Sequence, residues 1–294
     1  MIFKKTIGER IFDILNSIFM ILLMIVSIYP ILHVLFASFS NPENLMVHTG
    51  PILHPLGFTL KGYELVIKNP NIWSGYKNTI IYLVTGTALN LLMTAMGAYV
   101  LSRKGAMLTR PLMFLITFTM YFGGGLIPFY LMMKNLGLMN NIWAMILPGA
   151  ISTYNLIVMR TSFMAIPESL IESEKLDGAN DFVILFKIVL PLSKAILAVM
   201  ALFYGVACWN SWFNAMIFLK DRTLFPLQLI LREILITNDQ TTMSQGMISS
   251  TQQALYKPLI QYCTIIVGTL PIFFVYPFLQ KYFTKGVMIG SLKE

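Results

Sequence analysis

The sequence has little charge. Asp, Glu, Lys and Arg make up 12% of its 294 residues, about half of the share in average globular proteins, whereas apolar residues make up 56%. So little charge disfavours an ordinary soluble enzyme, and so much apolar residue excludes a disordered chain. The composition therefore indicates a helical membrane protein.

Cysteine and histidine are also scarce, with two and three residues. Cys208 and Cys263 lie far apart inside apolar runs and are expected to be buried, inert thiols. His33, His48 and His54 form no ligand set, so no metal site is expected, and we expect His33 to be a hydrogen-bonded bundle residue. The uncharged runs contain no paired carboxylates, so ion-coupled transport has no visible carrier.

Six segments lack charge over a length that can cross a bilayer. A helix needs about 20 apolar residues to cross, and a buried charge costs roughly 2.5–3.5 kcal/mol. The segments are Ile14–Leu32, Asn78–Ser102, Pro111–Met133, Asn135–Met159, Ala195–Leu219 and Pro258–Gln280. We therefore predict an all-α membrane protein with six transmembrane helices. Asn44–Leu60 and Gln240–Tyr256 are uncharged too, but their Pro, Gly or Thr/Ser/Gln content predicts loops.

The basic residues are unevenly distributed. With six spans, the side that holds both termini and the loops after spans two and four carries 13 of the 21 Lys and Arg, and the other side carries 8 on longer loops. The positive-inside rule then places both termini in the cytoplasm. We predict one transmembrane domain over 1–294, with outer loops at 39–75 and 220–257 and a long inner loop at 160–194. The net charge of +8 fits lipid headgroups better than nucleic acid.

The inner loop at 160–194 is the most informative part of the sequence, because it carries five of the thirteen acidic residues. A proline precedes Glu168, as at the start of many helices, and Glu168 suits the positive helix end. Gly178 stands where a left-handed residue can end that helix, and Asn180 or Asp181 can cap a second one. The pattern predicts two short helices joined at Gly178.

Charge pattern alone leaves two interpretations of this loop open. Glu168, Glu172 and Lys175 fall on one helix face at i, i+4 and i+7, so that their own pairs would tie down a solvated loop. In the other interpretation, the carboxylates dock onto Arg or Lys of a cytoplasmic partner.

The loop resembles the EAA signature of ATP-binding-cassette (ABC) importer permeases, which reads E-A-A, three residues, G, nine residues, I, one residue, L-P. The matching positions are Glu172, Gly178, Ile188, Leu190 and Pro191. Ser173 and Glu174 replace the two alanines, a departure that leaves the register intact.

Other segments resemble the carbohydrate-uptake branch of these permeases, the maltose-permease-like type. They are Ile166–Glu168, Leu170, Leu176–Ala179, Trp209–Asn210 and Lys281–Gly290. Gly123–Pro128 resembles a narrower group, the LplC/YtcP-type permeases linked to complex oligosaccharides.

This resemblance implies a type I importer permease core whose loop helix sits in a cleft of a cytoplasmic ATPase. The residues implied to couple to the ATPase are Glu168, Glu172, Leu176, Asp177, Gly178 and Pro191. Glu172 would meet a basic group, Gly178 would make the turn, and Pro191 would help set the start of span five. The sequence has no G-x-x-x-x-G-K-[ST] loop, so no cofactor is expected on this chain, and ATP with Mg belongs to the partner ATPase.

Span five also offers candidates for the substrate path, because aromatic rings stack on sugar faces and amides bond sugar hydroxyls. The candidates are Trp209, Asn210, Trp212 and Asn214. Asn210 and Asn214 would share a helix face at i, i+4, and the two tryptophans would form a neighbouring stripe. Tryptophan near a span end is usually an interface anchor, and asparagine inside a bundle often bonds another helix, so this alternative stays open as well.

Span three adds Tyr121 and Tyr130 as candidates, on either side of a glycine run at 123–125. A broken helix in a membrane must line protein or a watery cavity, although a packing notch explains the run equally well. Tyr154 and Asn155 in span four are weaker candidates.

The sequence thus predicts a multi-pass subunit of a carbohydrate importer, with oligosaccharide as the favoured substrate, in a bacterial plasma membrane. The resemblance implies a second homologous permease, two ATPase copies and an extracytoplasmic sugar-binding protein as partners, besides the lipid bilayer. The alternatives are a permease of a similar importer for peptides or amino acids, a standalone secondary transporter, and a structural membrane protein.

Overall fold

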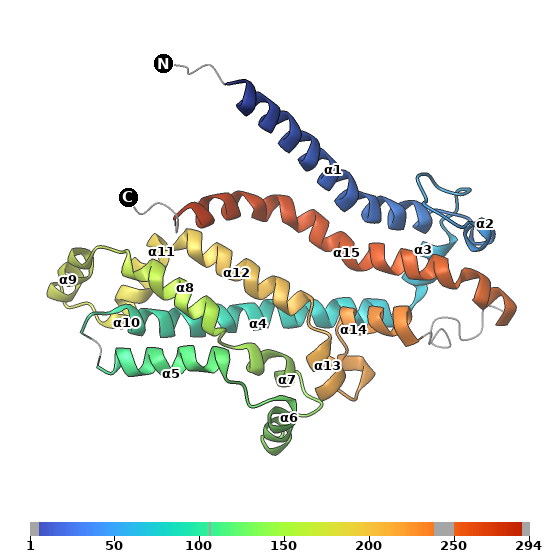
Figure 1. Ribbon diagram of the computed structural model, residues 1–294. Coiled ribbons are helices and arrows are strands. Elements are labelled where there is room, and N and C mark those ends of the chain that lie inside the picture. Colours follow the sequence, from blue (N-terminus) through green and yellow to red (C-terminus); the bar gives the residue numbers. More distant parts are fainter. Residues whose placement is uncertain (1–5, 106, 238–249, 290–294) are drawn as a thin grey trace. The chain divides into compact units, whose positions relative to one another are not determined.

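The computed structural model describes residues 6–105, 107–237 and 250–289, and their side chains except in 237, 250–254 and 278–289. These residues are helical and contain no strand, only an isolated bridge between Ser40 and Phe58 (Figure 1). The prediction of an all-α chain is therefore confirmed. The chain divides into two compact units, residues 1–69 with 233–270, and residues 70–232 with 271–294.

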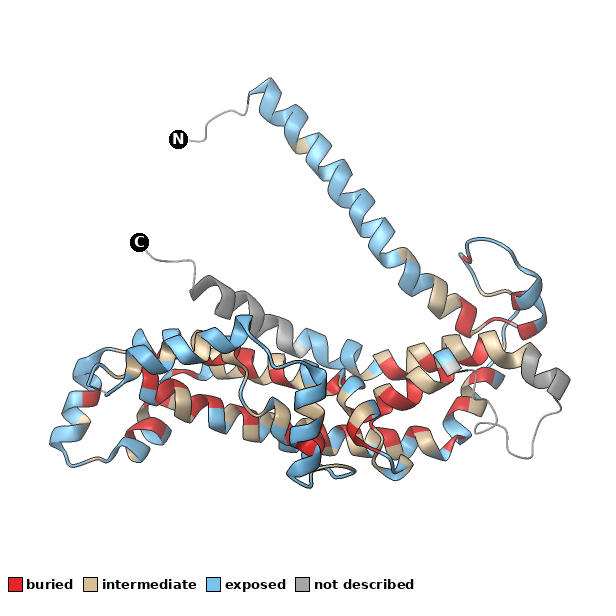
Figure 2. Cartoon of the chain, turned by 60° about the horizontal axis from the view of Figure 1, so that its bottom comes forward, coloured by how far each residue is buried: buried red, intermediate tan, exposed pale blue. Residues whose placement is uncertain are grey.

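The first unit is built around a long apolar helix. Its elements are α1 (Ile7–Ser38), α2 (Pro42–Val47), α3 (Lys61–Lys68), the π-helical η4 (Glu233–Thr237) and the first part of α15 (Ser250–Ile289). A capping box starts α1, because Thr6 Oγ1 accepts from the Glu9 N–H and Glu9 accepts from the Thr6 N–H. Most of α1 is exposed, as Figure 2 shows. An apolar surface of this size is typical of a helix that contacts lipid or another subunit.

Within the first unit, α1 contacts the segment that follows it, and α3 packs closely against α15. His33 Nδ1 accepts from the Ile52 N–H at 3.3 Å and lies 3.2 Å from the Tyr29 hydroxyl, which confirms it as a hydrogen-bonded residue. At Gly62, an added Cβ would lie 2.6 Å from Sγ of the fully buried Cys263. Only glycine fits at this crossing.

The second unit is organised on α4 (Pro70–Ser102), which packs against α8, α12 and α14 (Figure 1). Its other elements are α5 (Thr109–Tyr121), α6 (Leu126–Asn135), α7 (Trp143–Ile146), η1 (Leu147–Gly149), α8 (Thr153–Met164), α9 (Glu168–Leu176), α10 (Asp181–Val183), η2 (Ile184–Val189), α11 (Leu190–Leu192), α12 (Lys194–Trp209), α13 (Phe213–Phe218), η3 (Arg222–Leu224) and α14 (Leu227–Arg232).

One face of α4 is formed by buried residues at every fourth position. The residues are Tyr82, Gly86, Asn90, Thr94 and Ala98. An added Cβ at Gly86 would lie 3.3 Å from Cys208 Sγ, so α12 approaches α4 closely here. Further along, Ala98 joins Met159 and Phe163 of α8 and Met200 of α12 in the main apolar core.

Only some of the predicted spans are single continuous helices. Within the described residues, α1, α4 and Leu255–Pro277 of α15 are long and apolar enough to cross a membrane, and two bent helix pairs raise the number to five. α4 begins at Pro70 rather than after Gly75, and α15 begins at Ser250 inside the predicted loop, of which 240–249 lie outside the described residues.

The break predicted in span three is confirmed. α5 ends at Tyr121, α6 begins at Leu126, and the two helices are bent by 115°. Gly125, the residue directly before α6, has φ +83°, a value that favours glycine. At 13 and 10 residues, neither helix crosses a bilayer by itself.

Spans four and five are interrupted where the sequence suggested continuous helices. The fourth segment contains α7, η1 and the first part of α8, with Pro148 inside η1, where it removes a helical N–H donor. In the fifth, α12 ends at Trp209 and α13 begins at Phe213. The expectation that Asn210 and Asn214 share a helix face is therefore wrong.

Candidate coupling loop and central cavity

The loop after α8 forms the two short helices that the sequence predicts. α9 ends in a Schellman motif, because the Gly178 N–H donates to the Lys175 carbonyl at 3.1 Å and the Ala179 N–H donates to the Glu174 carbonyl at 2.9 Å. Gly178 takes φ +82°, the left-handed value that was expected. Asn180 Oδ1 then accepts from the Val183 N–H at 2.9 Å and caps α10.

The acidic residues of the loop have different environments. Glu168 pairs with Lys104, and this hydrogen bond raises the pKa of the Lys104 ammonium. Lys175 pairs with Asp181 at 3.7 Å, across the turn, rather than with the glutamates on its own face. The interpretation that pairs within α9 tie down the loop is therefore wrong.

One face of α9 points outward without a partner. Glu172 is exposed and makes no ion pair or hydrogen bond within the described part of the chain. Leu176, one turn later, is 89% exposed, and Asp177 beside it is exposed too. In contrast, Ile171 is 3% exposed and holds α9 against the core. The outward face thus offers a carboxylate next to an uncovered apolar side chain.

The loop is tied to the end of α4 by contacts between residues far apart in sequence. The Tyr99 hydroxyl donates to Asp181 Oδ1 at 2.8 Å. The Arg103 guanidinium lies 5.0 Å from the centre of the Tyr99 ring and donates to the Phe163 carbonyl at 3.2 Å. Arg160 Nε donates to the Leu101 carbonyl at 2.8 Å. These contacts fix α10 and the end of α8 to α4.

Pro191 lies next to a sharp change of direction. The helical stretch Asp181–Leu192 runs through the π-helical η2 and meets α12 at an angle of 87°. Pro191 is in the last turn before Ser193, where it removes an N–H donor. The helical stretch after Gly178 therefore contains Pro191 in its last turn.

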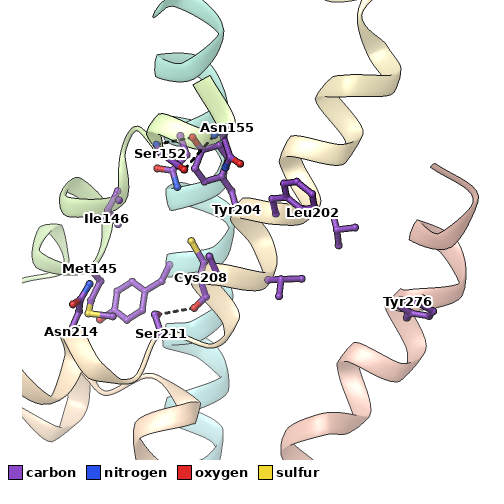
Figure 3. A pocket seen from close by; sticks show the side chains of 16 residues that line it. Met145, Ile146, Ser152, Asn155, Leu202, Tyr204, Cys208, Ser211, Asn214 and Tyr276 are labelled. Atoms are coloured by element: carbon purple, nitrogen blue, oxygen red, sulfur yellow. Dashed lines mark hydrogen bonds between the residues drawn. The ribbon is translucent and has the colours of Figure 1, made fainter. Parts of the chain in front are cut away.

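A cavity of about 670 Å³ lies between α4, α7, α8, α12 and α13, shown in Figure 3. This volume is within the range of small-molecule sites. The lining residues that carry a hydroxyl, amide or thiol are Tyr82, Asn90, Ser152, Asn155, Tyr204, Cys208, Ser211, Asn214 and, from α15, Tyr276. The remaining lining is apolar or aromatic, and no residue of the lining is charged. Such a surface suits a neutral, hydroxyl-rich ligand.

Hydrogen bonds around Tyr204 hold one wall of the cavity together. Its hydroxyl lies 2.6 Å from Thr94 Oγ1 and accepts from the Ser152 N–H at 3.0 Å, which ties α12 to α4 and to the start of α8. Ser152 Oγ caps α8 by accepting from the Asn155 N–H at 3.4 Å (Figure 3).

Of the six residues predicted for the substrate path, Asn214 alone lines this cavity. Trp209 is 8% exposed, with its ring centre 6.4 Å from that of Tyr76. The Asn210 amide donates to the Val206 carbonyl at 3.0 Å. Trp212 lies 4.4 Å from the Arg232 guanidinium. The four residues predicted as one cluster in span five therefore have separate environments in the structure.

The two tyrosines of the broken span also lie elsewhere. Tyr121 is 79% exposed at the end of α5. The Tyr130 ring stacks on Phe218 at 6.3 Å, within a small apolar cluster around Met133. The weaker candidate Asn155 does line the cavity, and its neighbour Tyr154 is 57% exposed and does not.

Sequence reasoning missed Asn90, Ser152 and Tyr204 in the cavity lining. The sequence contains a pattern that could have identified Asn90. It belongs to a series of aromatic, small and uncharged polar residues that occupy every fourth position of α4. Ser152 and Tyr204 carry no comparable pattern.

The chain is similar to known proteins over nearly its whole length. It is 40% identical to the polygalacturonan/rhamnogalacturonan transport system permease protein YtcP of Bacillus subtilis, over 97% of this chain and 99% of that protein. It is 38% identical to the protein LplC of the same organism, over 98% and 97%. A crystal structure of a bacterial ABC transporter involved in the import of the acidic polysaccharide alginate contains a chain that matches with a TM-score of 0.87 and 30% identity, over 95% of this chain and 99% of that one. No protein-family model matches.

Proposed function

Because the chain belongs to the permease subunits of ABC carbohydrate importers, we propose that it imports oligosaccharide through a path to which its central cavity contributes. The observation that carries this proposal is the cavity's neutral lining of amides and hydroxyls. Such groups exchange hydrogen bonds with sugar hydroxyls, whereas a lipid-facing surface has no use for them. ATP hydrolysis belongs to a separate ATPase subunit.

The substrate class follows from the relatives. One relative is named for polygalacturonan and rhamnogalacturonan, another for arabinooligosaccharides, and the solved transporter is described as an alginate importer. We propose that the substrate here is likewise a fragment of a complex polysaccharide.

We also propose the assembly and topology. A second homologous permease, two ATPase copies and an extracytoplasmic sugar-binding protein complete the transporter in a bacterial plasma membrane. Six crossings place both termini in the cytoplasm, in line with the excess of Lys and Arg on that side. The loop 160–194 is then the coupling loop, and 39–75 and 220–257 face outward.

Uptake by the assembled transporter tests this function. Vesicles that contain all subunits and ATP are supplied with binding protein and, in turn, with rhamnogalacturonan fragments, galacturonan fragments and arabinooligosaccharides. We expect ATP-dependent uptake of at least one of the three. Uptake of none, with a peptide or amino acid transported instead, would contradict the proposed substrate class.

The reactivity of a native cysteine can show whether a ligand occupies the cavity. Cys208 lines the cavity and is half-buried, whereas Cys263 is fully buried in the first unit. We expect N-ethylmaleimide to label Cys208 in the assembled transporter, and the imported oligosaccharide to slow this labelling. Mass spectrometry of the peptide around position 208 measures it, with Cys208→Ser as the blank. Unchanged labelling at saturating sugar would show that substrate does not enter this cavity.

The Tyr99–Asp181 hydrogen bond should help to couple loop movement to α4. Tyr99→Phe removes this bond and keeps the ring beneath Arg103. We expect the sugar transported per ATP hydrolysed to fall about two- to tenfold, in line with the loss of one solvent-screened hydrogen bond of about 0.5–1.5 kcal/mol. Tyr63→Phe is the matched control, because it removes a 2.7 Å hydrogen bond to Ser38 in the first unit. An equal fall in both variants would argue against a role in coupling.

A further inference from the structure

Asn90 presents a buried hydrogen-bond acceptor that the chain does not use. Its side chain lines the central cavity and is 4% exposed. Its carbonyl oxygen, Oδ1, has no hydrogen-bond partner among the described residues. Buried polar atoms without a partner are rare in native structures, because leaving them unpaired is costly. Such an atom at a cavity wall points to a ligand.

Most other polar side chains on this side of α4 are satisfied within the chain; the exception is Thr87, whose buried Oγ1 has no hydrogen-bond partner among the described residues and lies beside the Cys208 thiol. Thr79 Oγ1 accepts from the Leu227 N–H at 2.8 Å, and the Tyr82 hydroxyl donates to the Leu224 carbonyl at 2.7 Å. Thr94 Oγ1 lies 2.6 Å from the Tyr204 hydroxyl. Asn90 and Thr87 are thus exceptions on a face where polar groups otherwise serve helix packing, and of these two it is Asn90 that lines the cavity.

Two further amides line the same cavity from other helices. Asn155 comes from α8 and Asn214 from α13, and neither side chain makes a hydrogen bond within the described residues. Figure 3 shows Asn155 beside Ser152 and Tyr204, and Asn214 beside Met145. An amide both donates and accepts, so these two complement the acceptor of Asn90.

We propose that Asn90, Asn155 and Asn214 form a sugar-binding subsite in this subunit, in which Asn90 Oδ1 accepts a hydrogen bond from a sugar hydroxyl. The inference rests on the proposed function and adds that this permease half contacts the substrate itself. An ionised carboxylate carries no donor and cannot satisfy Asn90 Oδ1. The subsite therefore takes the neutral, hydroxyl-bearing face of a sugar residue, even where the oligosaccharide also contains uronates.

Protection of Cys208 measures occupancy of the cavity without the binding protein. The assembled transporter is incubated with rising concentrations of whichever fragment the wild type imports, and N-ethylmaleimide labelling of Cys208 is followed. For Asn90→Leu, we expect the half-protecting concentration to rise about three- to tenfold, the factor for one neutral hydrogen bond. Asn90→Asp keeps an acceptor at this position and should lie closer to the wild type.

Folding gives an independent readout. Since Asn90 Oδ1 bonds nothing in the chain, Asn90→Leu should accumulate in the membrane at least as well as the wild type. Thr79→Val, the control on the same face, removes an internal hydrogen bond and should reduce accumulation without shifting protection. Unshifted protection in Asn90→Leu would overturn the subsite and show that Oδ1 binds only water. A wild type without any protection would instead overturn the cavity as the substrate path.

Discussion

Glu172→Lys is expected to abolish sugar uptake while the chain still inserts and folds. Glu172 lies on the outward face of α9 and makes no ion pair or hydrogen bond within the described residues; its remaining interaction there is a minor electrostatic one with the exposed Lys104. If the carboxylate meets a basic group in the ATPase cleft, lysine replaces an attractive pair by a repulsive one. Breaking a close charge pair across an interface costs about 2–5 kcal/mol, or roughly 30- to 5,000-fold in affinity.

Two measurements on purified membranes check this prediction. Uptake should fall to the level without ATP, and the tagged permease should no longer retain the ATPase in a pull-down, whereas its amount in the membrane should not change. Because surface charge is screened, Glu172→Gln should retain part of both activities.

Glu174→Lys is the matched control. It makes the same change of charge on the same helix, about 200° around the axis from Glu172. Its side chain takes part in no ion pair within the described residues. We expect most of the uptake to remain. Equal losses in both variants would show that the net charge of α9 matters rather than a docking contact at Glu172.

The sequence predicted the local structure of the loop 160–194 well because this structure is determined by neighbouring residues. A helix start after proline, a left-handed glycine and an asparagine cap are all encoded within a few residues, and all three are present. The attachment of the loop was not predictable in this way. Tyr99 and Asp181 are separated by 82 positions, and their hydrogen bond depends on how α4 and α10 pack.

The substrate path was predicted poorly for a related reason. A run without charge shows that a segment can enter a membrane, but it does not show where a helix ends. The end of α12 at Trp209 is stabilised by a hydrogen bond from the Asn210 amide to Val206, so the polar residues counted as one helical cluster separate. The cavity is lined by residues of several helices, and single-sequence periodicity does not bring these together.

Gly178→Val is expected to lose most of the uptake, and Gly178→Ala much less. Gly178 has φ +82°, and an added Cβ would meet nothing within 4 Å, so backbone strain is the only structural penalty. Alanine in a left-handed conformation costs about 1–2 kcal/mol. A β-branched side chain tolerates positive φ worse still. Valine should therefore shift the turn, and with it the direction in which α9 presents Glu172.

The measurement is uptake by each variant, together with ATPase retention in the pull-down. Gly105→Val is the control, because an added Cβ there also meets nothing within 4 Å, and Gly105 is not among the glycines with positive φ. We expect it to behave like the wild type. If alanine and valine at position 178 reduced uptake equally, the loss would follow from any side chain at that surface, as in direct contact with the ATPase. A graded loss instead shows that the left-handed turn itself positions the coupling helix.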